Sequence, residues 1–257
     1  MPPSATHVMS LRSALSLRLA QSVAFGHRTR CFHSYQHANP DDNAFSPVED
    51  AILAASYSHV PEHGFSQRAL RLGARDAGYL DVSPAAFSDG SFSLIRYHLV
   101  TQRKALSTRS RTLFAHDQQP PPVATAVSEL TWARLMGNEA VIHQWQEALA
   151  IMAQPAWLSA SLKELSLLSD EIWFLAGDEA VDSSWYSKRA SLSVIYSTAE
   201  LFMTNDKSPG FSDTREFLER RLGEAGAAGK AVASLGQWMG FTMNAGINVL
   251  RSKGIRL

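Results

Sequence analysis

The sequence predicts an all-α protein. Apolar residues recur at helical intervals from Val123 to Leu222, and Pro155, Gly177 and Pro209 fall in the breaks between segments. No stretch of useful length alternates apolar and polar residues as a half-buried strand does. The 257 residues are 45% hydrophobic and 19% charged, so the chain can bury a sizeable core. We therefore expect one globular helical domain with appendages.

Caps and breaks place the individual helices. Ser46 is an N-cap residue, Pro47 follows it and Glu49 completes a capping box, which predicts a helix that runs to about Val60. A short helix fits residues 66–77, because Gly78 lies just past its end. The other expected helices are 82–87, 93–106, 127–135, 139–153, 159–175, 185–205 and 212–222, with a proline-rich loop at 108–123.

The first 32 residues have the composition of a mitochondrial presequence. Four arginines, many serines and no acidic residue precede Asp41. The run from Arg30 to Ser34 resembles an arginine-type processing site, and we expect cleavage after Phe32. Residues 33–45 would then form a polar linker. The alternative is a disordered basic tail on a cytosolic protein.

Several common motifs of enzymes and metal sites are missing from the sequence. The single cysteine, Cys31, lies in the presequence, which leaves no thiolate nucleophile and no cysteine metal site. We find no HExxH pair, no Glu-x-x-His pair of the di-iron bundles, no GxSxG elbow and no phosphate-binding glycine loop. We expect no catalytic residue, no metal and no enzymatic activity.

Residues 46–107 have helix-turn-helix organisation, because three short helices lead into a longer one. The stretch AILAASYSHVPEHGFSQRALRLGARDAGYLDVSPAAF resembles the N-terminal domain of TetR-family repressors. Its third element, Ser83 to Phe87, has no Arg, Asn, Gln or Lys to read bases, and Asp81 and Asp89 flank it. We expect no nucleic-acid partner, and a TetR-type ligand-responsive regulator is the alternative function.

Residues 223–257 predict a glycine-rich hinge followed by an amphipathic helix from Lys230 to about Arg251. No acidic residue follows Glu224. An apolar stripe with flanking cations is typical of helices that lie in a membrane interface and favour anionic lipids. The expected membrane-contacting residues are Leu235, Trp238, Met239, Phe241, Met243, Ile247 and Leu250. The alternative is a last helix packed on the body or on a second subunit.

The most informative segment runs from residue 170 to 222, where Trp185 and Tyr186 precede Lys188 and Arg189. Trp, Tyr and Arg are enriched at interfaces. Trp185 and Arg189 are four residues apart on one helix face, so the indole lies over the cation. Arg189 could form a structural ion pair with Asp178 or Asp182. Trp185 could instead be a core residue.

Three strings, DEIWFLAGD, SWYSKRASLSVIY and DKSPGFSDTREFLERRL, closely resemble the mitochondrial coenzyme Q biosynthesis lipid-binding proteins of the Coq nine family. The resemblance extends in register over about residues 46–257. It implies a TetR-like all-α fold, usually dimeric, that has lost DNA binding. It also implies a lipid-binding domain at 108–222, whose apolar cavity holds an isoprenoid quinone intermediate or a phospholipid as its only ligand.

The same resemblance implies a non-catalytic peripheral protein on the matrix side of the mitochondrial inner membrane. Such a protein presents its lipid to the demethoxyubiquinone hydroxylase of the coenzyme Q biosynthetic complex. The implied lipid contact is Arg189. The implied partner-binding residues centre on Trp185 and Tyr186 and include Ile172, Trp173, Asp182 and Lys188.

Overall fold

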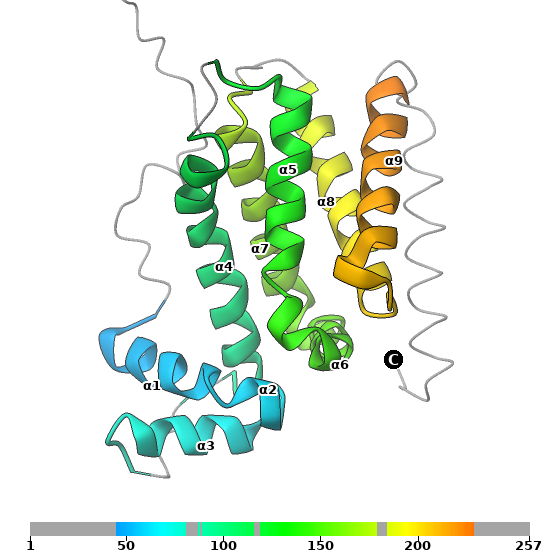
Figure 1. Ribbon diagram of the computed structural model, residues 1–257. Coiled ribbons are helices and arrows are strands. Elements are labelled where there is room, and N and C mark those ends of the chain that lie inside the picture. Colours follow the sequence, from blue (N-terminus) through cyan, green and yellow to red (C-terminus); the bar gives the residue numbers. More distant parts are fainter. Residues whose placement is uncertain (1–44, 81–86, 88, 116–118, 179–183, 229–257) are drawn as a thin grey trace, which may run out of the picture. The chain divides into compact units, whose positions relative to one another are not determined.

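The computed structural model describes residues 45–80, 87, 89–115, 119–178 and 184–228 (Figure 1). Every regular element in these ranges is helical, which confirms the all-α class. The predicted presequence and linker, nearly all of the 82–87 element, Asp182 and the seven predicted membrane-contacting residues lie outside the described residues.

Nine α-helices and two short 3-10 helices make up the described chain. The α-helices are α1 (Pro47–Tyr57), α2 (Val60–His63), α3 (Gln67–Asp76), α4 (Phe92–Leu113), α5 (Val123–Met136), α6 (Ile142–Met152), α7 (Pro155–Leu175), α8 (Ser184–Met203) and α9 (Ser212–Ala228). The 3-10 helices are η2 (Glu139–Val141) and η3 (Pro209–Phe211).

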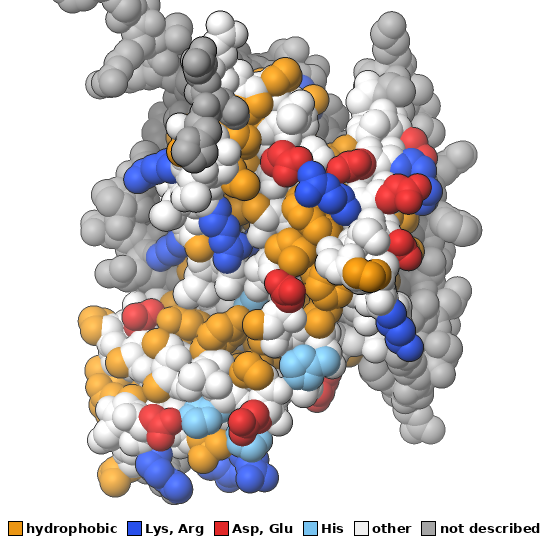
Figure 2. Space-filling view, in the orientation of Figure 1, with side chains coloured by type: hydrophobic (Ala, Val, Ile, Leu, Met, Phe, Trp, Pro, Cys, Tyr) orange, Lys and Arg blue, Asp and Glu red, His pale blue; other side chains and the backbone are white. Residues whose placement is uncertain are grey.

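The helices pack as a small layer of α1 to α3 against one end of a bundle formed by α4, α5, α7, α8 and α9 (Figure 1). Each part has its own apolar cluster, and α4 contributes to both: Leu94 and Ile95 to the cluster of the small layer, and Leu106 to that of the bundle. On the face shown in Figure 2, apolar side chains are interspersed with charges of both signs, and Lys and Arg side chains gather at the lower edge, by α3. None of the described helices is both long and apolar enough to cross a membrane.

The capping box at the start of α1 is confirmed. The Glu49 amide donates to the Ser46 hydroxyl at 3.3 Å, and the Ser46 amide donates to the Glu49 carboxylate at 2.8 Å. The helix ends at Tyr57, a little before the predicted end, and α2 follows with Pro61 in its first turn. Gly73 of α3 packs so closely on α1 that an added Cβ would lie 2.2 Å from the backbone of Ser56.

Two predicted helix ends are wrong. Helix α4 continues to Leu113, through the first third of the predicted loop, and the Arg109 guanidinium on this extension donates to the Ala133 carbonyl oxygen of α5 at 3.0 Å. Helix α9 continues through Gly223 and Gly226 to Ala228, so most of the predicted hinge is helical. Each glycine costs a helix about 1 kcal/mol relative to alanine. Leu222 and Ala225 pack against the bundle core and offset that cost.

Candidate functional site

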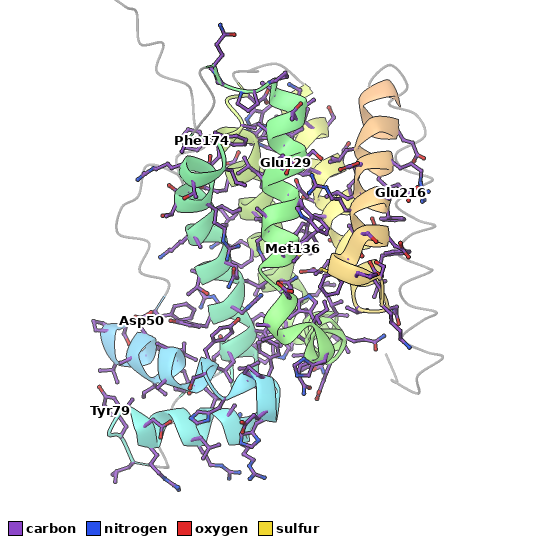
Figure 3. The ribbon with its side chains drawn as sticks, viewed as in Figure 1. Asp50, Tyr79, Glu129, Met136, Phe174 and Glu216 are labelled. Carbon is purple, nitrogen blue, oxygen red and sulfur yellow. The ribbon has the colours of Figure 1, made fainter. Side chains whose placement is uncertain are left out.

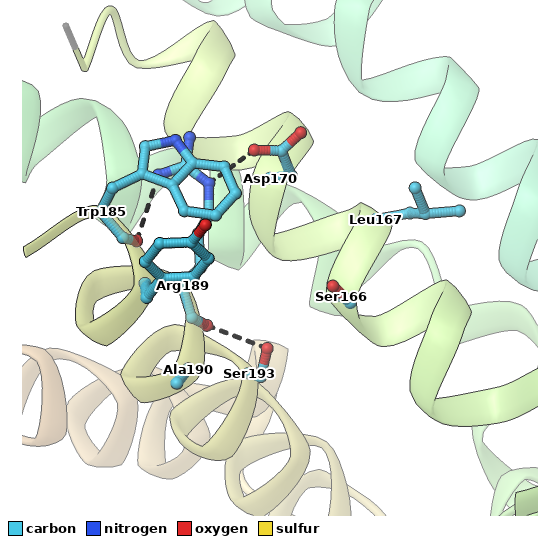
Figure 4. A pocket seen from close by; sticks show the side chains of 8 residues that line it. Ser166, Leu167, Asp170, Trp185, Arg189, Ala190 and Ser193 are labelled. Carbon is cyan, nitrogen blue, oxygen red and sulfur yellow. Dashed lines mark hydrogen bonds and ion pairs between the residues drawn. The ribbon is translucent and has the colours of Figure 1, made fainter. Parts of the chain in front are cut away.

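A pocket of about 380 Å³ lies between α7 and α8, at the segment that the sequence singles out (Figure 4). Helix α7 contributes Ser166, Leu167 and Asp170, and helix α8 contributes Trp185, Tyr186, Arg189, Ala190 and Ser193. Spacings of three and four residues place these side chains on the facing sides of the two helices. The pocket therefore has hydroxyls, aromatic rings and an ion pair in its wall.

Arg189 is held at the pocket by contacts on several sides. Its Nε donates to Asp170 Oδ1 at 2.5 Å, and its Nη1 lies 3.9 Å from Asp178 Oδ2. The guanidinium carbon lies 3.9 Å from the centre of the Trp185 ring, as the four-residue spacing predicts. Only 12% of the Arg189 side chain is exposed. The predicted alternative for Arg189, an ion pair with Asp178, is confirmed. The sequence did not predict the closer ion pair with Asp170.

A second cation–aromatic pair lies next to the first. Lys188 Nζ donates to Asp178 Oδ1 at 2.7 Å and lies 5.3 Å from the centre of the Trp173 ring. Asp178 therefore lies between the two cations. The turn after α7 fixes its position: Gly177 has a φ of +78°, and the Asp178 amide donates to the Trp173 carbonyl oxygen at 3.0 Å. This is the Schellman arrangement that ends many helices at glycine.

The predicted partner-binding residues differ in exposure. Tyr186 is 73% exposed, and its ring lies edge-on to Trp185 with 4.7 Å between centroids. Trp185, Trp173 and Lys188 are half-buried, so Trp185 is at the pocket wall and is not a core residue. Ile172 is 0% exposed and belongs to the bundle core. Its prediction as a partner-binding residue is wrong, because its side chain points inward from α7.

The pocket wall is electrically balanced. The two charged residues that line it, Asp170 and Arg189, form an ion pair, and beside the pocket Asp178 pairs with Lys188. Ser193 donates to the Arg189 carbonyl oxygen at 2.9 Å, a hydrogen bond within α8 (Figure 4). Within the described ranges, no group of three or more His, Cys, Asp and Glu side chains lies close enough to hold a metal ion. The pocket can position a polar, planar group between aromatic rings and charged side chains.

A buried hydrogen-bond network, which sequence reasoning missed, joins the small layer to the bundle. Asn138 is at its centre: its side-chain oxygen accepts from Arg134 Nη1 at 2.7 Å, and its amide nitrogen donates to Glu200 Oε1 at 2.8 Å. Tyr196 also donates to Glu200 Oε1, at 2.8 Å. Arg134 and Glu200 are both buried and are linked through Asn138, while Nε and Nη2 of Arg134 have no hydrogen-bond partner among the described residues.

His98 extends this network from α4 to α1. Because the Asn138 oxygen can only accept, His98 Nε2 is the donor of their 2.8 Å bond, and Nδ1 accepts from the Tyr57 hydroxyl at 2.7 Å. Burial, together with the positive charge of Arg134, lowers the pKa of His98 to about 3. The imidazole is therefore neutral at physiological pH and acts as a fixed link between α1 and the bundle.

Comparisons with known proteins identify the family of this chain. The family model described as COQ9 matches residues 158–229, which include every residue of the pocket wall. The ubiquinone biosynthesis protein coq9, mitochondrial, of Schizosaccharomyces pombe is 35% identical over 257 residues, covering 96% of this chain and 100% of that protein.

Vertebrate relatives match a shorter part. The mitochondrial COQ9 proteins of Xenopus tropicalis and Homo sapiens are 37% and 33% identical over 201 residues, covering 74% of this chain and 62% of each relative. This chain thus spans less than two thirds of the length of those two proteins. The fission yeast relative, matched over its whole length, shows the family directly. The chain belongs to the COQ9 family, as the three sequence strings predicted.

Proposed function

We propose that this chain is a non-catalytic, lipid-binding accessory protein of ubiquinone biosynthesis in the mitochondrion. The names of its relatives, ubiquinone biosynthesis protein and mitochondrial, support the pathway and the compartment. The composition of the first 32 residues agrees with import into mitochondria. The finer proposal, that the protein binds a lipid and presents it to an enzyme, rests on the pocket between α7 and α8.

The observation that carries the proposal is a pocket with a polar rim next to an apolar core. Asp170 and Arg189 form the ion pair in its wall, and Leu192 and Ile195, one to two turns further along α8, are buried in the bundle cluster. An isoprenoid lipid has the same division, with a polar ring and a long apolar tail. Ligand sites that combine apolar walls with a few oriented polar groups are the usual kind for such molecules.

The charge balance favours a quinone ring over a phosphate headgroup. A phosphate would bring further negative charge to a wall where Asp170 already pairs with Arg189. A neutral quinone oxygen can accept a hydrogen bond from Arg189 without displacing that carboxylate. The bound lipid is therefore an isoprenoid quinone intermediate rather than a phospholipid.

Tyr186 and Trp185 form the surface that meets the protein partner. An exposed tyrosine packed edge-on against a half-buried tryptophan is a rigid aromatic anchor of the kind that dominates interface energies. Because these rings also line the pocket, a partner bound here would lie at its mouth. The partner is the demethoxyubiquinone hydroxylase of the coenzyme Q biosynthetic complex. The protein acts as a TetR-like homodimer on the matrix side of the inner membrane.

Lipid extraction tests this function. The full chain is purified without added lipid, and its organic extract is analysed by mass spectrometry beside that of a protein of similar size prepared in the same way. A polyprenyl quinone in the extract of this chain alone supports the proposal. An empty protein that retards duplex DNA in a gel would overturn it in favour of a TetR-type regulator.

A further inference from the structure

The outer surface of α3 carries a row of arginines that the proposed function does not use. Arg68, Arg71 and Arg75 are all exposed. At about 100° per residue, they fall within about 60° of one another around the helix axis. The buried residues of α3 (Ala69, Leu70, Gly73 and Ala74) occupy the opposite side, against α1. We name Arg68, Arg71 and Arg75 the α3 basic face.

Asp76, the acidic residue of α3 nearest to this face, contacts a residue outside the face. Asp76 Oδ2 pairs with His59 Nε2 at 2.6 Å, on the side of α2. Within the described part of the chain, Arg68 and Arg71 make no ion pair and no side-chain hydrogen bond. Both guanidinium groups are exposed to solvent, where an anionic partner can reach them.

Two exposed apolar side chains are fixed at the end of the same helix. Gly78, with a φ of +79°, ends α3, and the Tyr79 amide donates to the Ala74 carbonyl oxygen at 2.8 Å. This Schellman arrangement holds Tyr79 and then Leu80 directly beyond the arginines. Tyr79 is 37% exposed and Leu80 is 77% exposed. Single exposed apolar residues are common on protein surfaces, so Tyr79 and Leu80 are informative here only because they adjoin the α3 basic face.

We propose that the α3 basic face, together with Tyr79 and Leu80, binds the surface of an anionic phospholipid bilayer. The arginines complement the phosphate charges, and Tyr79 and Leu80 enter the headgroup region. A nucleic acid could pair with the arginines, but its phosphate backbone would offer no apolar contact to Leu80. A bilayer offers both. Figure 2 shows Lys and Arg side chains at this edge, and Figure 3 shows that Tyr79 lies at the far end of the molecule from Phe174 of α7.

This inference is independent of the pocket and of the predicted C-terminal membrane helix. The pocket is between α7 and α8, whereas α3 packs on α1. A bilayer contact through α3 would give the small layer a function at the membrane.

Vesicle flotation of the full chain tests the proposal. The variants are Arg68→Gln/Arg71→Gln and Leu80→Ser, and the matched control is Lys163→Gln/Lys207→Gln, which removes two exposed charges from the bundle. The vesicles are phosphatidylcholine with or without phosphatidylglycerol, at low and at high salt. A cation near an anionic bilayer is worth roughly five-fold in binding, so the double arginine variant should bind about twenty-fold more weakly.

The expected pattern is specific. Binding should require phosphatidylglycerol, fall with salt, fall strongly in the arginine variant, fall several-fold in Leu80→Ser and stay unchanged in the lysine control. Equal losses in the arginine variant and the control, or no loss in the arginine variant, would overturn the proposal. The proposal would also be overturned if the wild-type protein bound duplex DNA but not anionic vesicles. None of these results bears on whether a quinone co-purifies, so the two proposals can fail separately.

Discussion

The guanidinium of Arg189 stacks on the indole of Trp185 at 3.9 Å, while Asp170 binds its Nε from the neighbouring helix. The stacking joins two turns of α8, and the ion pair joins α8 to α7. One side chain therefore fixes both the aromatic surface and the wall of the pocket. A change at Arg189 should affect ligand binding and partner binding together.

The stacking should be measurable as a coupling energy. We predict that a double-mutant cycle with Trp185→Leu and Arg189→Gln gives a coupling of about 1 kcal/mol in the free energy of unfolding, measured by urea denaturation. The matched cycle is Trp132→Leu with Arg215→Gln, where the two groups are 5.5 Å apart and Arg215 is more exposed. Its coupling should be smaller. Equal couplings would show that burial does not strengthen the Trp185 pair.

Tyr186 should matter to the partner and not to the fold. Because it is largely exposed, Tyr186→Ala should change the free energy of unfolding by less than about 0.5 kcal/mol. The same change should weaken association with the hydroxylase at least about ten-fold in a surface-immobilisation assay, as expected for an aromatic anchor. Leu162→Ala, an exposed apolar residue of α7, is the control and should bind normally. If Tyr186→Ala lowered the melting temperature as well as the affinity, Tyr186 would instead be needed for the stability of the fold.

His98 should make stability depend on pH. Its pKa is about 3 in the folded protein, below the ordinary value of 6.5, so between these values the unfolded chain binds more protons than the folded one. The stability from neutral His98 is complete above about pH 6.5 and is lost as the pH falls toward 3. The slope is at most about 1.4 kcal/mol per pH unit.

The test compares urea denaturation of wild type and His98→Gln between pH 7 and pH 4. The variant should be less stable at pH 7 and show a shallower slope. If the His98 variant retained the full slope, the loss of stability in acid would have to come from other groups.

Deletion of residues 230–257 should separate membrane binding from lipid binding. The deleted segment includes all seven predicted membrane-contacting residues, whereas every pocket residue remains. We predict weaker flotation with anionic vesicles and an unchanged amount of extracted quinone. Unchanged flotation would contradict the membrane role of this segment, and a loss of bound quinone would show that it contributes to the site.

Local patterns in the sequence predicted local structure well. The Ser46–Glu49 capping box and the Trp185–Arg189 stack depend on neighbours three or four residues apart, whose geometry the helix fixes. The extension of α9 through Gly223 and Gly226 was not predicted, because tertiary packing of Leu222 and Ala225 outweighs the low helix propensity of glycine.

Contacts between distant segments could not be predicted from periodicity. Asp170 and Arg189 are on different helices, and their pairing depends on the register of α7 against α8. Asn138 and Glu200 are 62 residues apart, and nothing in the sequence around either one indicates a buried network. Ile172 was assigned to the partner surface from the family resemblance, which names the helix segment but not the side of the helix on which each residue lies.

Native mass spectrometry of the purified full chain tests the central claim most directly, because it counts bound quinone per molecule in wild type, Arg189→Gln and Arg215→Gln. Arg215 is a matched control, since it also pairs with a carboxylate, Glu129 at 2.6 Å, and lies over a tryptophan ring, away from the pocket. The pocket account predicts quinone on wild type and Arg215→Gln, and little on Arg189→Gln. Equal occupancy in all three proteins would contradict the claim that the α7–α8 pocket holds the quinone ring.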